Sequence, residues 1–517
     1  MKKLLAMLLA LVMILSLAAC GEKVDPTDAP EATDAPKATD APEETAAPVP
    51  AEPEHIVFWA DGIEANADGN MPGREAVIKA MNEYAKEKIN VTFEYIYSSE
   101  SDKLKMELAT SDKIDMIWSS KGASAVWDPF IKEGALMDIT ELLPNYSTLV
   151  ESIPEMVWES TEYDGRRYVV PIMKESFTGG TYIFPKEMAD KVKANTGIDV
   201  NEIKVETIRD LGNLTDYLQA VVDMDDTALG VVKSFTFVNM MGYDPIYSVV
   251  SSGVGLDAST GKIVDLYATQ EYADYVALMH DWNQRGFFHD ELAVGNLKGA
   301  VMNEWRNTGN YGMTQWVTTP DNLNNAAVRY KGVEVYGIEI GERQTGSNSM
   351  MGTDFAISAK TDKAEACLKL IELILTDPVM ADLYAFGIEG VNYNRNADGT
   401  VTRIADSGYG MDTWMASSVF TASLLEGESL NKKELYAADN AAAVASPTMG
   451  FRFDSEKVAA EVSALANVAK QYTHLLEYGF YDPDEYLQNF LNDRKAAGVD
   501  NIIAEMQAQY DAWVANK

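Results

Sequence analysis

Aromatic residues beside polar ones form the pattern in this chain with the clearest binding chemistry. Trp59 and Trp118 each end a short apolar run, while Trp305 and Trp316 flank the Gly-rich stretch 307–315. The C–H faces of sugar rings pack on aromatic faces, and sugar hydroxyls bond to carboxylates and amides. The pattern therefore indicates recognition of a saccharide. Packing in a core is the alternative explanation for any single Trp.

Catalytic motifs are not recognisable in this chain. It lacks the glycine-rich Walker and Rossmann patterns, the Gly-x-Ser-x-Gly elbow and the His-Glu-x-x-His pair. The four histidines have no metal-ligand spacing, and the acidic stretch 61–68 lacks the spacing of a calcium loop. We therefore expect no catalytic residue, no metal and no cofactor. An enzyme stays open as an alternative, because a glycosidase needs only two carboxylates and this chain has 80 acidic residues.

The chain from His55 to Trp118 alternates between two hydrophobic periods. Strands are predicted at 55–59, 91–97 and 114–118, and helices at 75–88 and 102–109. This β-α-β-α-β order predicts a parallel sheet with helices packed on its faces. In open sheets of this kind, ligands bind beyond the carboxyl ends of the strands. A binding site is therefore expected in the loops that follow the three strands.

Later segments carry turn and cap signals. Residues 163–171 predict a tight hairpin, with Asp164-Gly165 at its turn, that leads into a strand. Further helices are predicted at 207–222, 269–285, 362–375 and 377–386. Asp377 is expected to cap the last of these. The C-terminal part from about residue 450 is predicted to be helical, with Asp482 capping one helix, Gly498 ending it and Asp500 capping the next.

Composition limits the partners. The formal net charge is -38, and it becomes -40 once residues 1–19, with two lysines and no acid, are removed. A chain this acidic does not hold nucleic acid by phosphate neutralisation, and anionic lipid repels it. Cys20 and Cys367 are the two cysteines, and Cys367 shares a helical stripe with Leu370 and Ile374. We expect Cys367 to be a buried packing residue.

The N-terminus reads as an export signal. Lys2 and Lys3 precede an apolar run at 4–15, which is too short to span a bilayer comfortably. The string Leu17-Ala-Ala-Cys20 resembles the lipobox of bacterial lipoproteins, in which the Cys is diacylated and becomes the mature N-terminus. The resemblance implies a signal peptide at 1–19 and lipidation of Cys20. An ordinary secretory signal with an incidental Cys is the alternative.

A linker is predicted between Cys20 and the body. From Thr27 the chain repeats Thr-Asp-Ala-Pro with an acid or Lys and Ala in six-residue units. Repeated Pro and low hydrophobicity leave little to bury, so residues 20–54 are expected to be an extended, disordered stalk. At about 3.1 Å per residue it would reach roughly 100 Å. Such a spacer favours a Gram-positive-type envelope, and no membrane-spanning segment is expected after residue 20.

The order of motifs resembles the extracellular solute-binding proteins of ABC importers, in their family-1, carbohydrate-type branch. In addition, the tail is similar to a group of lipoproteins of this kind from Firmicutes. The motifs that carry the resemblance are the lipobox, 55–59, 114–118, 164–171, 299–302 with its following Trp, 387–393, 450–454, 496–499 and 507–513. Their order covers nearly all of residues 55–517, although each motif alone is loose.

The resemblance implies a fold. It is an α/β, two-lobed fold of the periplasmic-binding-protein type (class II), with a hinge and helical C-terminal additions. Lobe 1 would comprise about 55–170 and 345–430, and lobe 2 about 172–340 and 450–517. Residues 169–171 would form one hinge crossing, and the strands around Tyr336 and Phe355 another. The lobes of such proteins close on ligand like a clam shell.

Seven residues are predicted to line the cleft. They are Trp59, Asp61, Trp118, Lys174, Trp316, Glu389 and Tyr393. The tryptophans would stack on sugar rings, the two acids would accept hydroxyl protons, and Lys174 would donate. The spacing after Met302 departs from the family pattern, so Trp305 and Trp316 compete for one stacking position. A strand ending near Trp316 favours that residue, whereas Trp305 is equally well explained as a helix core residue.

These observations predict a lipid-anchored receptor on the extracellular face of the cell membrane. It would capture a small solute, an oligosaccharide, and deliver it to the permease subunits of an ABC transporter. We expect a monomer that touches the membrane only through its lipid and binds no nucleic acid. An oligopeptide or other polar-solute receptor, a surface glycan-active enzyme, and a sensor or adhesion lipoprotein without a transporter are the alternatives.

Overall fold

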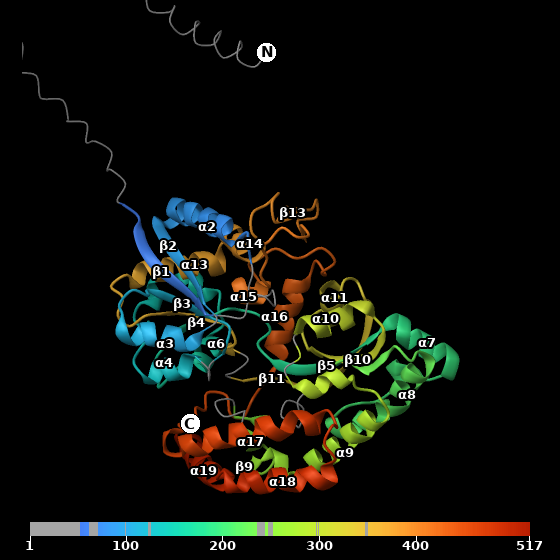
Figure 1. Cartoon of the computed structure of the whole chain (residues 1–517). Coiled ribbons are helices and arrows are strands. Elements are labelled where there is room, and N and C mark those ends of the chain that lie inside the picture. The colour runs from blue at the N-terminus through green and yellow to red at the C-terminus, as the bar shows by residue number, and fades with distance from the viewer. Residues whose placement is uncertain are drawn as a thin grey trace, which may run out of the picture. The chain divides into compact units, whose positions relative to one another are not determined.

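The computed structural model describes residues 52–61, 71–98, 100–122, 126–234, 243–246, 252–295, 297, 299–346 and 350–517. The chain divides into two units, residues 1–51 and 52–517 (Figure 1), and the second is the body described below. Cys20, the export signal and most of the predicted linker lie outside the described residues.

A five-stranded sheet organises the first lobe, with the strand order β2-β1-β3-β12-β4. Its strands are β1 (Glu54–Asp61), β2 (Val91–Ser98), β3 (Met116–Ser119), β4 (Val169–Pro171) and β12 (Asp354–Ile357). β1 is parallel to β2 and β3, and α2 (Arg74–Ile89) and α3 (Ser101–Thr110) connect them. The predicted β-α-β-α-β order is therefore confirmed. β12 returns from far along the chain and pairs antiparallel with both β3 and β4.

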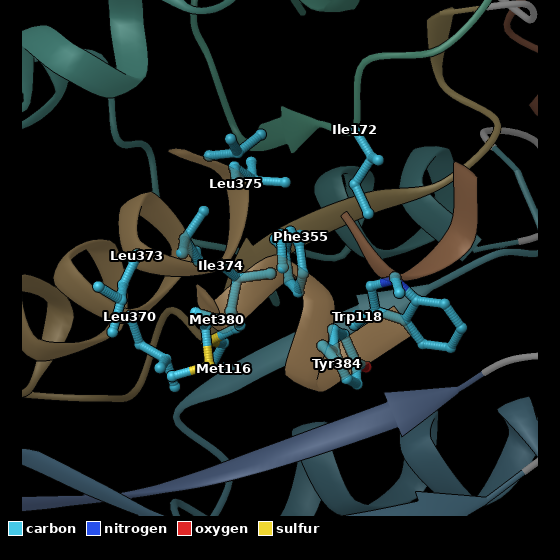
Figure 2. Packing of buried hydrophobic residues seen from close by; sticks show 14 of the residues in the cluster. Met116, Trp118, Ile172, Phe355, Leu370, Leu373, Ile374, Leu375, Met380 and Tyr384 are labelled. Atoms are coloured by element: carbon cyan, nitrogen blue, oxygen red, sulfur yellow. The ribbon is translucent and has the colours of Figure 1, made fainter. Parts of the chain in front are cut away.

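Helices cover both faces of this sheet because successive strand residues point to opposite sides. Phe58 and Trp118 belong to the core on one face, shown around Trp118 and Phe355 in Figure 2. Trp59 and Ile117 belong to the core on the other face. The first core includes residues of α2, α5 (Ser147–Glu151), α6 (Glu155–Thr161), α13 (Ala364–Thr376), α14 (Pro378–Phe386) and α15 (Thr413–Ala416). The second includes residues of α3 and α4 (Asp128–Lys132). A small hairpin, β13 (Tyr393–Arg395) with β14 (Val401–Arg403), follows α14.

A second five-stranded sheet, β15-β11-β5-β10-β6, organises the second lobe. Its strands are β5 (Thr178–Pro185), β6 (Leu229–Val231), β10 (Tyr311–Val317), β11 (Val335–Thr345) and β15 (Val444–Ala445). Residues from α7 (Lys186–Thr196), α8 (Thr215–Met224) and α9 (Gln270–Gln284) form its main core. A smaller cluster includes Ala326 of α11 (Asn322–Arg329) and the partly buried Trp316. α10 (Gly299–Thr308) precedes β10.

The C-terminal part joins this lobe. α17 (Ala459–Glu477), α18 (Pro483–Ala496) and α19 (Val499–Asn516) pack against one another (Figure 1). Apolar side chains of α17, α19 and the segment 451–458 share a core with a three-stranded sheet of β7 (Asp244–Pro245), β8 (Val254–Asp257) and β9 (Lys262–Asp265). The predicted helical C-terminus is thus observed from Ala459 onward.

Local predictions are mostly confirmed. Asp377 accepts hydrogen bonds from the backbone N–H groups of Val379 and Met380, so it caps α14. The hairpin turn at Asp164-Gly165 has φ of 52° and 72°, as a two-residue primed turn requires. Cys367 is buried, as predicted.

Two predictions need correction. The helix expected at 207–222 starts as a 3-10 helix over Ile208–Leu214 and becomes α8 only from Thr215. The predicted cap at Asp500 is wrong, because α19 already begins at Val499. Gly498, at φ 94°, occupies the cap position, which a side chain would strain.

The chain passes between the lobes three times. It leaves β4 for β5 through residues 172–177 and returns from β11 to β12. It then leaves again through α16 (Lys432–Ala442) to β15, which pairs with β11. Asn440 of α16 bonds to the backbone of both Lys174 and Ser176, so the first and third connections are fastened together. The exact lobe boundaries stay a prediction. Within the part of the chain that is described, no helix has the length and apolar character needed to cross a membrane.

Arg494 offers a test of how the C-terminal helices are held. Its fully buried guanidinium donates to Asp265 at 3.0 and 2.8 Å and to the Ser252 carbonyl at 2.6 Å, and it lies 4.7 Å from the Tyr267 ring centroid. Arg494→Met should cost about 3–5 kcal/mol, because it leaves Asp265 without its cation. Urea unfolding measures this shift. Arg285→Met, which breaks an exposed pair with Asp281, should change stability by less than about 1 kcal/mol. Equal shifts in the two variants would contradict a stabilising role for the buried Arg494–Asp265 pair.

Candidate functional site

The carboxyl ends of three strands meet at one edge of the first sheet. Asp61, the last residue of β1, is in register with Ser98 at the end of β2 and with Ser119 at the end of β3. This is the edge at which open α/β sheets bind ligands. The loops that leave this edge of the sheet are therefore the candidate ligand-binding region.

Asp61 is a fully buried polar residue at this edge, like its neighbour Ser119. Lys121 Nζ donates to Asp61 Oδ1 at 2.7 Å, and Ser119 Oγ lies 3.5 Å from Oδ2. The Asp61 side chain is fully enclosed, while Lys121 remains partly exposed. Close by in the fold, the Arg74 guanidinium stacks 4.6 Å from the ring centroid of Tyr97. Burial raises the pKa of Tyr97, and the charge of Arg74 partly opposes that rise. Acceptors and donors of hydrogen bonds thus converge here with little net charge.

The two strand tryptophans are not exposed at this edge. β1 continues two residues past Trp59, so Trp59 lies inside the strand and packs in the core on one face of the sheet. Trp118 packs in the core on the opposite face, where its Nε1 donates to the Met415 carbonyl at 2.9 Å. Both side chains are buried. Core packing, the alternative named for single tryptophans, accounts for their surroundings.

Lys174 lies within the first connection, just past β4, as its position in the sequence predicts. Its Nζ donates to Glu175 at 2.7 Å and lies 6.0 Å from the ring centroid of Trp414. Trp414 is 38% exposed at the start of α15. We call Lys174, Glu175, Trp414 and Asn440 the hinge group. It combines an exposed aromatic face with a donor and an acceptor.

Trp414 was missed in the sequence because it does not follow an apolar strand. Its only signal is the run Gly408-Tyr-Gly-Met-Asp-Thr-Trp414, a Gly-rich loop that ends in an aromatic residue. Trp316 does lie where it was expected, one residue before the end of β10. It is half-buried, and its ring meets that of Tyr330 edge-on at 5.4 Å. Trp305, on α10, packs against the main core of the second lobe and lies 4.8 Å from the His289 ring.

The last two predicted residues, Glu389 and Tyr393, meet around Arg395 rather than at the strand ends. Arg395 Nε lies 3.5 Å from Glu389, and its Nη2 donates to Tyr393 Oη at 3.3 Å and to Asp382 at 2.7 Å. Glu389 is exposed, whereas Tyr393 is buried against Phe386. The seven predicted residues are therefore divided among several places, of which the Asp61 edge and the hinge group carry the most convergent polar chemistry.

Asp354 is a buried carboxyl group close to the hinge group. It begins β12, in register with Ser119 and Pro171. Neither carboxylate oxygen makes a hydrogen bond of good geometry within the described body. Burial raises the pKa of Asp354 well above its ordinary range, and the nearby Trp127 indole, Arg452 and Lys174 offset only part of the rise. Burial therefore favours the neutral form of Asp354.

The described residues contain no group of three or more His, Cys, Asp or Glu arranged to hold a metal ion. A hollow of about 540 Å³ lies on the second lobe, between the start of α7 and the turn before β11. None of the seven predicted residues lines it. The convergent polar and aromatic groups lie at the strand ends and the hinge, and none of them lines this hollow.

Comparison with known proteins gives two matches along the sequence. A family described as bacterial extracellular solute-binding protein matches residues 68–381, more than half of the chain. A domain of unknown function matches residues 447–515. A carbohydrate ABC transporter substrate-binding protein of Streptococcus pneumoniae serotype 4 is 22% identical over 75% of this chain and 77% of its own length.

Solved structures share the fold. An N-glycan transport solute-binding protein from Streptococcus pneumoniae superposes with a TM-score of 0.75, at 18% identity over 90% of this chain and 99% of its own. An HMO-binding, ABC-transporter-associated solute-binding protein from Bifidobacterium longum infantis gives a TM-score of 0.56, at 14% identity over 89% and 99%. The predicted two-lobed α/β fold is thereby confirmed.

The buried carboxyl of Asp354 predicts a pH dependence of stability. In the unfolded chain it ionises above about pH 4, whereas burial raises its pKa in the folded protein. Its contribution to stability is therefore full below about pH 4 and is lost as pH rises towards the folded pKa. Asp354→Asn should gain in melting temperature, relative to the unaltered protein, as pH rises above about 4.

Asp398 provides a control of opposite sign. Its pKa is lowered, chiefly by a hydrogen bond from the Thr400 hydroxyl, so its contribution is present above the unfolded pKa. Asp398→Asn should lose melting temperature over the same rise in pH. Parallel curves for Asp354→Asn and the unaltered protein would show that Asp354 ionises normally.

Proposed function

Because the chain belongs to the family of bacterial extracellular solute-binding proteins, we propose that it captures an oligosaccharide between its two lobes and delivers it to the permease of an ABC transporter. The observation that carries the proposal is the family match together with the names of the relatives. One curated relative is a carbohydrate ABC transporter substrate-binding protein, and the pneumococcal N-glycan protein is also solved in complex with Man5GlcNAc.

Lobe closure is the proposed mechanism. Both open and closed arrangements are accessible, and a ligand that contacts both lobes stabilises the closed one by its additional contacts. Three chain connections that lie close together suit a hinge, because their backbone torsions absorb the rotation while each sheet stays rigid. Asn440, which fastens the first and third connections, makes them move together.

The residues proposed to hold the sugar come from both lobes. Trp414 and Trp316 offer aromatic faces, and Lys174 and Lys121 donate to hydroxyl groups. Asp61 accepts from hydroxyls through the edge that it shares with Ser119. Glu389 and Tyr393 stay predictions, at the margin near Arg395. Trp414 is the main stacking residue proposed, because its side chain is partly exposed beside the Lys174–Glu175 pair and core packing does not account for that exposure.

The cellular setting is also proposed. Diacylated Cys20 would hold the protein on the extracellular face of the membrane, with residues 21–54 as a spacer. The protein would act as a monomer, with the permease and the solute as its partners. The family and the solved relatives are binding proteins, and we propose that this chain likewise binds its solute without catalysing a reaction.

Thermal shift with a panel of neutral oligosaccharides and oligopeptides tests the ligand class, since a ligand raises the melting temperature of the state that it binds. We expect oligosaccharides to stabilise the full chain and peptides to leave it unchanged. Stabilisation by peptides alone would contradict the proposal, and breakdown of a bound glycan, seen by chromatography, would favour an enzyme.

Trp414→Ala should weaken the best oligosaccharide of that panel about tenfold, because it removes one stacking face worth about 1.4 kcal/mol. Calorimetric titration measures the affinity. Val514→Ala, an exposed apolar side chain on α19, serves as the control and should bind as the unaltered protein does. Equal affinity of the two variants would remove Trp414 from the site.

Cys20→Ser should release the protein from the membrane fraction into the medium and abolish incorporation of labelled fatty acid. Cys367→Ser is the matched control, because that thiol is buried and should leave lipidation intact. Fatty acid incorporation into the Cys20→Ser variant would contradict the anchor.

A further inference from the structure

Two cationic side chains on the second lobe have no carboxylate partner among the residues that the structure describes. Lys233 follows β6, and its carbonyl accepts from Gln315 N–H at 2.8 Å, so it lies beside the end of β10. Arg306 lies on α10 and packs on Thr314 of the same strand. Val317, at the end of β10, is in register with Gly180, a few residues after the first hinge connection. The two cations therefore lie towards the hinge side of the second sheet.

Arg306 is almost completely buried among neutral groups. Only 7% of the residue is exposed. Its Nε donates to Thr314 Oγ1 at 3.1 Å and its Nη1 to Asn303 Oδ1 at 3.0 Å, and the guanidinium lies 5.6 Å from the Tyr330 ring centroid. Among the described residues it makes no ion pair, and its hydrogen bonds use Nε and Nη1 only. Nη2 is not among the fully enclosed atoms that lack a partner, so it is the nitrogen left to bind a solute.

Lys233 is half-buried and is likewise without an ion pair among the described residues. Burial lowers the pKa of Lys233, and the nearby charge of Arg306 lowers it further. Residues 227–242 and 305–320 contain no Asp or Glu, although Asp226, Glu304 and Asp321 border these ranges. This absence stands out in a chain whose acids outnumber its bases by 80 to 42.

Two neighbouring cations with reduced access to water destabilise the fold unless an anion joins them. Two other largely buried arginines of the body have such a partner. Arg494 pairs with Asp265, and Arg452 pairs with Asp128. Trp316 shares a face of β10 with Thr314, the residue to which Arg306 donates. Its buried Nε1–H has no hydrogen-bond partner among the described residues, so it adds a further donor on the face where Arg306 lies.

We propose that Lys233 and Arg306 form a subsite for a carboxylate group of the solute, so that the natural ligand is an acidic oligosaccharide carrying a uronic or sialic acid unit. This inference rests on the proposed function. The planar guanidinium and the ammonium donate charge-assisted hydrogen bonds to the carboxylate oxygens. Trp414 and the Asp61 edge then bind the neutral remainder of the chain of sugars.

Matched pairs of glycans test the subsite. Calorimetric titration of the full chain compares a neutral oligosaccharide with the same glycan carrying one terminal uronic or sialic acid. We expect the acidic member to bind at least about tenfold more tightly. The advantage should shrink when salt rises from about 0.01 M to about 0.15 M, which shortens the Debye length from about 30 Å to about 8 Å.

Variants locate the effect. Lys233→Gln and Arg306→Gln should each remove most of the advantage of the acidic glycan and leave the affinity for the neutral one unchanged. Arg306→Lys keeps the charge and should retain part of the advantage, which guards against loss of folding in Arg306→Gln. Lys191→Gln, an exposed lysine on α7, is the control and should change neither affinity.

The outcomes separate the two proposals. Equal binding of both members of a pair, or an advantage that survives Lys233→Gln, overturns the subsite and leaves the oligosaccharide receptor standing. A preference for sulfated over carboxylated glycans overturns the carboxylate assignment. Failure of every glycan to bind overturns the receptor proposal and the subsite with it.

Discussion

The pairing of β12 between β3 and β4 is the interaction on which the architecture depends. Residues 354–357 arrive after the chain has built four of the five strands of the second sheet, yet they complete the first sheet by bonding to strands on both sides. This insertion forces the chain to cross between the lobes a second time. It also brings Asp354, the hinge residue Pro171 and the strand end at Ser119 into one register. The strand ends of the first lobe and the hinge are therefore one structural unit.

The C-terminal segment of unknown function has a structural role that follows from its contacts. Its helices share a core with β7, β8 and β9, so they extend the second lobe. Arg452, at the start of the segment, reaches the first lobe: it pairs with Asp128 at 2.9 Å and donates to the carbonyls of Ser160 and Glu162. Asp454 adds a pair with Lys132 at 3.1 Å. Because Arg452 and Asp128 are largely buried, this pair is less screened than a surface one and favours the lobe arrangement described here.

Charge is distributed unevenly between the two lobes around the hinge. On the first lobe, Asp61 pairs with Lys121, and burial raises the pKa of Asp354 and so favours its neutral form. In the first connection, Lys174 pairs with Glu175. Neutral, convergent donors and acceptors suit sugar hydroxyls, which carry no charge. On the second lobe, Lys233 and Arg306 have no carboxylate partner among the described residues. A carboxylate would find little to bind on the first lobe and two cations on the second, so the lobes divide the recognition of a mixed solute between them.

How much of this could be read from the sequence depended on whether the signal was local. The parallel strand and helix order, the Asp377 cap and the hairpin at Asp164 follow from short-range periodicity and turn chemistry, and they were predicted correctly. Trp59 and Trp118 show the limit of that approach. Both end an apolar run, but which face of the sheet each one occupies depends on strand register and on helices hundreds of residues away, such as α15 above Trp118. Lys233 and Arg306 carry no motif at all. They stand out because no carboxylate lies against them among the described residues. Which side chains surround a residue depends on the fold, so the sequence alone could not single out these two cations.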